Sequence, residues 1–401
     1  MSAPADLAPD LRRILGIQAV RALLYGFGAV ILGSSLAANG ASTLQVGILG
    51  AAILAGMAIA AIAVGVAGDR LGRRRAYTGL LGLMGIVGLA YALTDRLWIL
   101  VVLALLGVMS TDANENGPLT TLEQSMIGQA PSATRVRVFG RYNAVAYLAG
   151  ALGALLAGGP AFVQRFWTST PTGNAWFLVF PLGAAVCLWL AHGLSPELEL
   201  NQAATGAPLE RSRSTVTKLA SLFAVDAFAG GFVITVFIVY WFSTELGASK
   251  ETMSLVFFMA GLLQAGSSVV APRLAMRIGL LPTMVFTHLP SNILLMLIPL
   301  APNLEVAIVI LLLRFALSQM DVPTRQAYIA AMVDPQERTA AAAATNSARY
   351  VARPFGPLIG TFLMNNVAIG APWVAAGALK SLYDVALWRV FSSVPLPEAT
   401  D

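Results

Sequence analysis

Charged residues are scarce in this sequence: Asp, Glu, Lys and Arg make up 11% of its 401 residues. Soluble domains are about one quarter charged, so the composition excludes an ordinary soluble protein. The chain has one cysteine, Cys187, and two histidines, which excludes an internal disulfide and argues against a zinc site. It also lacks the G-x-x-x-x-G-K-[ST], H-E-x-x-H and G-x-S-x-G patterns. We therefore expect neither an enzyme nor a bound cofactor or metal.

Apolar residues are abundant instead, at 57% of the chain, with a mean hydropathy of +0.74. Apolar runs recur about every 30 to 35 residues, and a helix needs about 20 residues to cross the hydrocarbon core. Barrel strands would alternate apolar and polar residues, which these runs do not. The sequence predicts an all-α integral membrane protein with twelve transmembrane helices. The expected spans cover about 14–37, 43–67, 77–94, 97–120, 138–161, 175–194, 217–243, 252–276, 282–301, 304–328, 346–368 and 372–393.

The basic residues are distributed unevenly over the ends of these spans. The net charge of +5 could indicate nucleic acid as a partner, but most of the basic residues lie at alternate span ends. About fifteen lie at one set of ends, and about three, Arg96, Arg165 and Lys250, lie at the other. This bias predicts a multi-pass protein of the cell membrane with both termini in the cytoplasm. Its first apolar run is too long for a signal peptide and is expected to be retained as a span.

One long polar connection, residues 195–216, follows the sixth span and is expected to be a cytoplasmic linker. It would separate an N-terminal six-helix half, 1–194, from a C-terminal half, 217–401. The two halves repeat a pattern at an offset of about 200 residues, which indicates duplication. Two of the matched pairs exchange a basic for an acidic residue. The matched pairs are Arg21 with Asp226, Glu123 with Arg325, Arg135 with Arg338, and Gly153 with Gly356.

A short motif between the second and third spans resembles the signature loop of the major facilitator superfamily, G-x-x-x-D-R-x-G-R-R. Its defining residues are Gly65, Asp69, Arg70, Gly72, Arg73 and Arg74. A decayed copy, residues 272–279, stands between the eighth and ninth spans and keeps Gly279. The resemblance implies two pseudo-symmetric six-helix halves that alternate access to a central site. It also implies that Asp69 closes a cytoplasmic gate against the start of the eleventh span.

Ionisable residues at membrane depth gather in the first, fourth, seventh and tenth spans, which in that superfamily line the central cavity. Each would cost at least about 2.5–3.5 kcal/mol without a partner or water. We expect the acids of span four to pair with Arg21, and Asp226 or Asp321 to pair with the arginines of span ten. Static bridges that hold the helix register are the alternative to a transport role. The candidate substrate and proton cavity comprises Arg21, Asp112, Glu115, Glu123, Asp226, Arg314, Asp321 and Arg325.

Proton coupling requires a carboxylate whose pKa is raised by burial and lowered by a nearby cation, so that a conformational change can switch its protonation. The candidates, in falling order of preference, are Asp226, Asp112 and Glu115. Packing is the favoured role for His288. A local i,i+4 pair is favoured for Lys380 with Asp384. Arg349 is expected to be a gate partner or an anchor.

The sequence therefore predicts a secondary transporter of a small organic solute that acts as a monomer in the bilayer, with protons as the coupling ion. Proton-coupled efflux is favoured, and uptake of an organic ion by symport is the alternative. A membrane-embedded enzyme or a lipid scramblase would need a nucleophile–base pair or a lipid-accessible polar groove. The sequence offers carboxylates and arginines instead.

Overall fold

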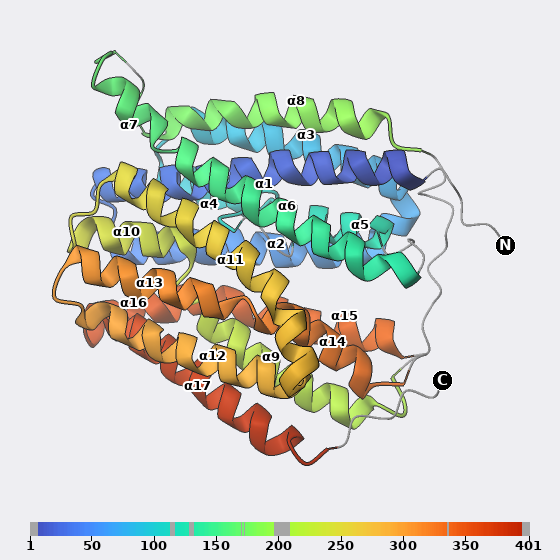
Figure 1. The fold of residues 1–401 in the computed structure, drawn as a ribbon. Helices are drawn as coiled ribbons and strands as arrows, with labels where there is room; N and C mark the ends of the chain where they lie inside the picture. The colour runs from blue at the N-terminus through green and yellow to red at the C-terminus, as the bar shows by residue number, and fades with distance from the viewer. Residues whose placement is uncertain are drawn as a thin grey trace. The chain divides into compact units, whose positions relative to one another are not determined.

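The computed structural model describes residues 7–112, 117–127, 132–169, 171, 173–195, 209–334 and 337–394, and these ranges are almost entirely helical (Figure 1). Within them, nine helices are long and apolar enough to cross a membrane. The other three expected spans coincide with α4 and α5, with α15 and α16, and with α17. Most of the expected linker, at 196–208, lies outside the described residues.

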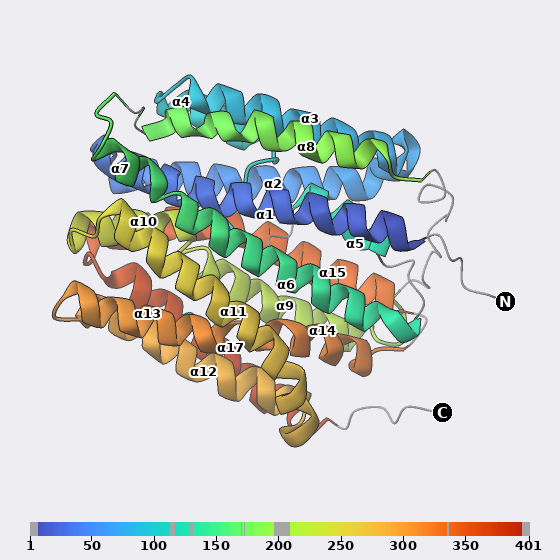
Figure 2. The ribbon, with the colours of Figure 1, turned by 45° about the horizontal axis from the view of Figure 1, so that its top comes forward.

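Contacts between residues divide the chain into two compact units. The first comprises Met1–Gln202 and Ile234–Leu262. Within it, α1 packs along α6, α8 and α10, and α3 lies beside α8 (Figure 2). Its elements are α1 (Leu7–Ala38), α2 (Thr43–Leu71), α3 (Arg73–Ala92), α4 (Leu97–Ala104), α5 (Pro118–Ile127), α6 (Ser132–Leu156), α7 (Gly159–Gln164), η1 (Gly173–Leu178), α8 (Val179–His192), α10 (Thr235–Glu245) and the first part of α11 (Lys250–Ile278).

The second unit comprises Ala203–Val233 and Leu263–Asp401. Within it, α9 packs against α15 and α17, and α12 packs against α13, α14 and α17. Besides the rest of α11, its elements are α9 (Arg213–Gly230), α12 (Leu280–Leu297), η3 (Ile298–Leu300), α13 (Leu304–Ser318), α14 (Asp321–Met332), α15 (Arg338–Ala352), η4 (Arg353–Phe355), α16 (Gly356–Asn366) and α17 (Ala371–Phe391).

Four of the expected spans are interrupted. Span four stops at Ala104 and resumes at Pro118, and span seven breaks between α9 and α10. Span ten breaks just before Asp321, and span eleven is interrupted by η4. Non-helical backbone at membrane depth is tolerated only inside protein or beside water, and such broken helices are typical of transporter binding sites.

The signature motif and its decayed copy share one backbone feature, a single-residue turn at glycine. Gly72 joins α2 to α3 with φ 83°, and Gly279 joins α11 to α12 with φ 95°. Only glycine adopts this left-handed conformation without strain. The copy has therefore lost the acidic residue and the arginines after the glycine, but it keeps Arg277 and the glycine that the turn requires.

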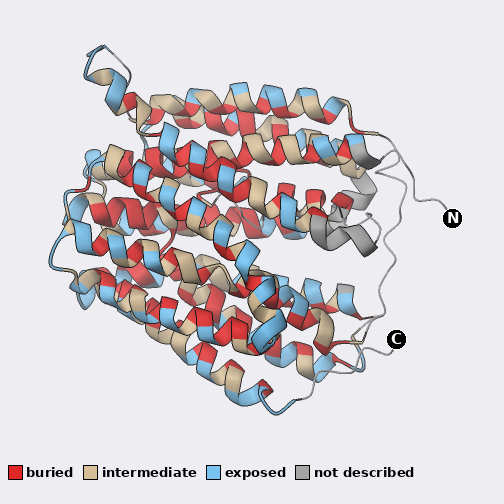
Figure 3. Cartoon of the chain, in the orientation of Figure 1, coloured by how far each residue is buried: buried red, intermediate tan, exposed pale blue. Residues whose placement is uncertain are grey.

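Burial follows the pattern of a helical membrane protein (Figure 3). In both units, helices carry buried residues on one side and exposed residues on the other. Many of the exposed residues are large and apolar, such as Ile86, Trp98 and Trp189. Exposed apolar faces of this kind suit contact with lipid rather than water.

Candidate functional site

A buried ion pair lies at the centre of the first unit. Arg21 on α1 is 1% exposed and Glu123 on α5 is fully buried. The Arg21 Nη2 donates to Glu123 Oε2 at 2.6 Å. The predicted pairing of Arg21 with an acid of span four is therefore confirmed, with Glu123 as the partner.

Tyrosines on neighbouring helices donate further hydrogen bonds to the carboxylate of this pair. The Tyr77 hydroxyl on α3 donates to Glu123 Oε1 at 2.5 Å, and Tyr142 on α6 donates to Oε2. Arg21 Nη2 also donates to Gln18 Oε1 at 2.6 Å. Both carboxylate oxygens are satisfied, as a buried ion pair requires, whereas Arg21 Nε and Nη1 have no hydrogen-bond partner among the described residues.

Asp112 occupies the break in span four and is only partly buried. Its backbone N–H donates to the Ser110 hydroxyl oxygen at 3.0 Å. Its Oδ1 accepts a hydrogen bond from the Thr235 hydroxyl, at the start of α10, at 2.9 Å. This hydrogen bond holds Asp112 against the start of α10, where span seven resumes. Glu115, the next acid of this span, lies outside the described residues.

A larger charge cluster lies in the second unit around Asp226 of α9, which is 3% exposed. Lys380 Nζ on α17 donates to Asp226 Oδ1 at 2.5 Å. Arg349 Nη1 on α15 and Arg325 Nη1 on α14 lie 3.4 and 3.6 Å from Oδ2. One carboxylate therefore faces cations from three other helices.

His288 of α12 extends this cluster to a second carboxylate. Its Nδ1 lies 2.9 Å from Asp384 Oδ1 on α17, and its Nε2 lies 3.8 Å from Asp226 Oδ1. Asn292 donates to Asp384 Oδ2 at 2.8 Å. The expected local pairing of Lys380 with Asp384 is wrong, because these residues contact Asp226 and His288 instead. The hydrogen-bonded packing role favoured for His288 is consistent with its contact with Asp384, and its other ring nitrogen also faces Asp226.

The arginines of span ten differ from each other. Arg325 Nη1 donates to Asp321 Oδ2 at 2.7 Å and also faces Asp226, as the sequence predicted. Arg314 lies on α13, where its guanidinium stacks over the Phe315 ring at 5.0 Å. Its Nε has no hydrogen-bond partner among the described residues. Arg325 is thus part of the cluster, whereas no contact with it is recorded for Arg314.

The matched positions of the two halves make matched contacts. Arg21 pairs with Glu123 in the first unit, and their counterparts Asp226 and Arg325 face each other in the second. Charge has been exchanged on both members, so each half keeps an attractive pair. The exchange therefore preserves a helix contact, as the register interpretation expected, and the second unit adds further charges around it.

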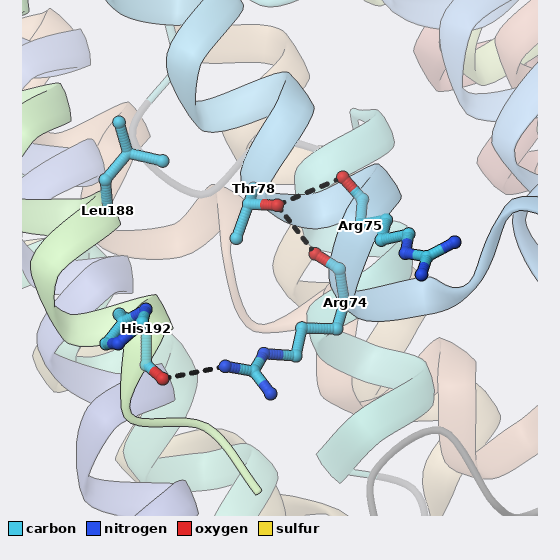
Figure 4. A pocket seen from close by; sticks show the side chains of 5 residues that line it. All are labelled: Arg74, Arg75, Thr78, Leu188 and His192. Carbon is cyan, nitrogen blue, oxygen red and sulfur yellow. Dashed lines mark hydrogen bonds between the residues drawn. The ribbon is translucent and has the colours of Figure 1, made fainter. Parts of the chain in front are cut away.

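The gate motif is described only in part. Gly65, Asp69 and Arg70 lie in the last turns of α2, and their side chains lie outside the described part of the structure. Arg74 is described: its Nη2 donates to the backbone carbonyl of His192, at the end of α8, at 2.8 Å (Figure 4). This arginine therefore closes a contact between α3 and α8.

Sequence reasoning missed several contributors to these clusters. Tyr77 and Tyr142 carry no charge and lie in apolar spans, so they drew no attention. Lys380, Arg349 and His288 lie in spans twelve, eleven and nine, and the sequence suggested other roles for them: a local pair, a gate partner or anchor, and packing. Their charge at membrane depth was the signal that could have found them. Among the described residues, no group of three or more His, Cys, Asp or Glu is arranged to hold a metal ion.

Known proteins resemble this chain in both sequence and fold. Residues 219–400 match the family model described as the Major Facilitator Superfamily. This part of the chain is therefore similar to the major facilitator superfamily. An uncharacterized membrane protein of Saccharomyces cerevisiae is 27% identical over 425 residues, covering 96% of this chain and 94% of the relative. That relative carries no functional description to transfer.

Solved structures support the superfamily fold over nearly the whole chain. The inward-open xylose transporter XylE from E. coli superposes with a TM-score of 0.73 at 17% identity, covering 97% of this chain and 98% of that one. A D-xylose–proton symporter gives 0.72 at 18% identity, covering 94% and 97%. The human organic anion transporter MFSD10 gives 0.68 at 16% identity, covering 96% and 100%. The predicted twelve-helix fold class is thereby confirmed.

Proposed function

We propose that this protein is a proton-coupled secondary transporter and that the charge cluster of its second unit binds the coupling proton. The observation that carries the proposal is the position of His288 between Asp384 and Asp226. Both carboxylates and the imidazole are buried. Histidine is the side chain whose charge ordinarily changes near neutral pH.

A proton on His288 would change the contacts of Asp226. With Nδ1–H donating to Asp384, a neutral imidazole presents the lone pair of Nε2 toward Asp226 Oδ1, which is a repulsive arrangement. Protonation of Nε2 makes that contact attractive. It then competes with Lys380 for the same carboxylate oxygen. The proton therefore decides which helix, α12 or α17, holds Asp226 most strongly.

The net charge of the same cluster would change when it binds a proton. Its three carboxylates face three permanently basic side chains, so a neutral His288 leaves the charges balanced. An added proton leaves one excess positive charge in an apolar surrounding, which is costly unless the helices rearrange or an anion compensates it. The members are Asp226, Asp321, Asp384, Arg325, Arg349, Lys380 and His288.

The carboxylates favoured by sequence fit this role less well. Asp226 is surrounded by cations that compensate its charge. Asp112 is partly exposed and accepts from Thr235. Glu115 lies outside the described residues. We assign Asp226 to positioning and the proton to His288 with Asp384.

Histidine NMR tests the proton site without a known substrate. The chain has two histidines, so ¹⁵N-histidine-labelled His192→Gln protein reports on His288 alone. We expect its ring signals to move with pH as one proton binds. Asp384→Asn should shift that transition, whereas Glu305→Gln, an exposed acid on α13, should not. Signals that stay constant from pH 5 to 9 would exclude His288 as the proton carrier.

Transport itself is tested in proteoliposomes containing pyranine as an internal pH indicator. Solutes that raise the thermal unfolding temperature of the purified protein are then added outside. We expect some of them to drive proton movement, and His288→Gln should retain solute exchange but lose the proton movement. Absence of solute flux with every stabilising compound would contradict the transporter proposal.

Export of a small organic solute in exchange for protons is the direction we propose. The polar break around Asp112 suits an organic solute that carries polar groups. Uptake by symport is the second candidate, favoured by the structural likeness to a D-xylose–proton symporter. The sign of the proton movement decides: outward solute with inward protons supports export, and both moving inward supports uptake.

A further inference from the structure

A pocket opens between one end of α3 and one end of α8 in the first unit. Its volume is about 570 Å³, and Figure 4 shows side chains from both helices around it. Neither the ion pair of Arg21 nor the cluster of Asp226 contributes to it. Its lining residues are Arg74, Arg75, Thr78, Leu188 and His192.

The pocket is suited to an anion. Arg74 is held in place because its Nη2 donates to the His192 carbonyl, and its guanidinium is directed into the space between the helices (Figure 4). Arg75 also lines the pocket with an exposed side chain, which extends away from that of Arg74 in Figure 4. No carboxylate stands among the described residues that line the pocket. Proteins commonly bind phosphate with arginine, because the guanidinium presents paired N–H donors that match the phosphate oxygens.

The contact between α3 and α8 is close only further along α3 from these arginines. Further along, Gly85 and Gly88 allow α3 to pack closely on Ala184 and Phe180 of α8. Nearer the pocket, Gly79 has open space where a side chain would stand.

Gly82 has the same open space. Arg75, Gly79, Gly82 and Ile86 recur at helical spacing along one face of α3. The α3 surface at Gly79 and Gly82, which lies between Arg75 and Ile86 and carries no side chains, is called the track.

Both helices also carry exposed apolar side chains. Ile86 on α3 is 67% exposed, and Leu182 and Trp189 on α8 are 71% and 75% exposed. In a membrane protein such side chains face acyl chains. A basic pocket that continues into an apolar track matches a molecule with an anionic head and an apolar tail.

We propose that this pocket binds an anionic glycerophospholipid. Its phosphodiester group lies against Arg74 and Arg75, and one acyl chain follows the track over Gly79 and Gly82. The positive-inside distribution of basic residues assigns this end of α3 to the cytoplasmic leaflet, where anionic lipids concentrate. A bound lipid would tie the end of α3 to the end of α8.

The test measures binding of dioleoyl phosphatidylglycerol to the purified full-length protein in neutral detergent, by native mass spectrometry. Dioleoyl phosphatidylcholine and glycerol 3-phosphate are the comparison ligands. We expect phosphatidylglycerol to bind best, and Arg74→Gln or Arg75→Gln to weaken it about ten-fold, the effect of losing one charge-assisted hydrogen bond. Arg277→Gln, at an exposed arginine of α11, should leave binding unchanged.

A second variant tests the track independently of charge. Gly79→Phe fills open space and should block the acyl chain, whereas Gly266→Phe fills open space on α11 and serves as the control. Equal binding of both phospholipids, or Arg75→Gln behaving as Arg277→Gln does, would overturn the proposal. Glycerol 3-phosphate competing as well as the lipid would identify a soluble-anion site instead and would also overturn it.

Discussion

Buried charges gather around two carboxylates, Glu123 and Asp226, and both carboxylates are compensated by named neighbours. Glu123 accepts hydrogen bonds from Arg21, Tyr77 and Tyr142, so none of its oxygens is left without a partner. In the other unit Asp226 is met by several cations. The first arrangement is saturated with fixed donors, whereas the second contains a histidine that can gain or lose a proton. This difference is why we assign coupling to the second unit.

The Arg21–Glu123 pair should be strongly coupled in stability. Arg21→Gln or Glu123→Gln alone should lower the free energy of unfolding by about 3–5 kcal/mol, because the other charge stays buried without its partner. The double variant should lose clearly less than the sum of the two single losses. Thermal or denaturant unfolding in detergent measures all three.

An exposed ion pair provides the control for this comparison of single and double variants. Arg165 and Glu251 lie 3.2 Å apart, and the Arg165 side chain is 64% exposed. Arg165→Gln should therefore change stability by no more than about 1 kcal/mol. Additive losses at Arg21 and Glu123 would show that the buried pair contributes no specific coupling.

Helices in this fold approach each other closely at glycine. Gly153 on α6 faces the Leu23 carbonyl of α1, and its counterpart Gly356 on α16 faces Gly231 beyond the end of α9. A side chain at either position would overlap backbone atoms. The repeat has thus retained glycine where backbones touch, a common device in membrane helix packing.

Replacement of Gly153 should separate α1 from α6. Gly153→Val should destabilise the protein by about 1–3 kcal/mol or more, because backbone must move to admit the side chain. Gly140→Val on the same helix faces open space and is the matched control. Unfolding temperature and folded yield are the readouts, and equal effects of the two variants would contradict this packing role.

The start of α9 depends on a carboxylate from the connection between α14 and α15. Glu337 accepts backbone N–H groups of Glu210, Arg211 and Ser212, each at 2.9 Å. These hydrogen bonds lower the pKa of Glu337 to about 2. The ionised form therefore stabilises the folded state at any pH above its unfolded pKa of about 4.3.

This stabilisation should be lost as the pH falls from about 4.3 through about 2. Glu337→Gln should lower the unfolding temperature at pH 7 and flatten the acid dependence, because the group that must be protonated is gone. Glu305→Gln, at an exposed acid, should leave both unchanged. Unfolding temperatures recorded between pH 7 and pH 3 provide the measurement, and an unaltered acid dependence in Glu337→Gln would disprove the assignment.

At the scale of the whole molecule, the distribution of basic residues predicts the orientation in the membrane. Arg165 and Arg211 are assigned to opposite sides, and their side chains are 64% and 85% exposed. The single cysteine, Cys187, is buried. New cysteines can therefore be introduced at either arginine with little background from the native thiol.

Labelling with a membrane-impermeant maleimide tests this orientation. In a Cys187→Ser background, Arg165→Cys should react in intact cells, and Arg211→Cys should react only after the cells are opened, because the reagent cannot cross the bilayer. The Cys187→Ser protein without a new cysteine is the control. The reverse pattern would place both termini outside.

Several properties followed from the sequence because they depend on composition and local spacing. Twelve apolar runs indicated the helices, and the signature motif indicated the superfamily. The exchanged pairs, Arg21 with Asp226 and Glu123 with Arg325, indicated where charge lies at membrane depth. Even the partner of Arg21 was within reach, because only a few acids lie at a suitable position.

Other properties were decided by tertiary structure alone. The sequence by itself determined which residues carry charge inside the membrane, but it paired Lys380 with Asp384 because they are neighbours on one helix. The fold instead brings α9 against α17, so Lys380 contacts Asp226 and leaves Asp384 to His288. A buried charge is stabilised by whichever opposite charges surround it in space. Those neighbours lie 96 to 154 residues away in the sequence, which is why their identity required the fold.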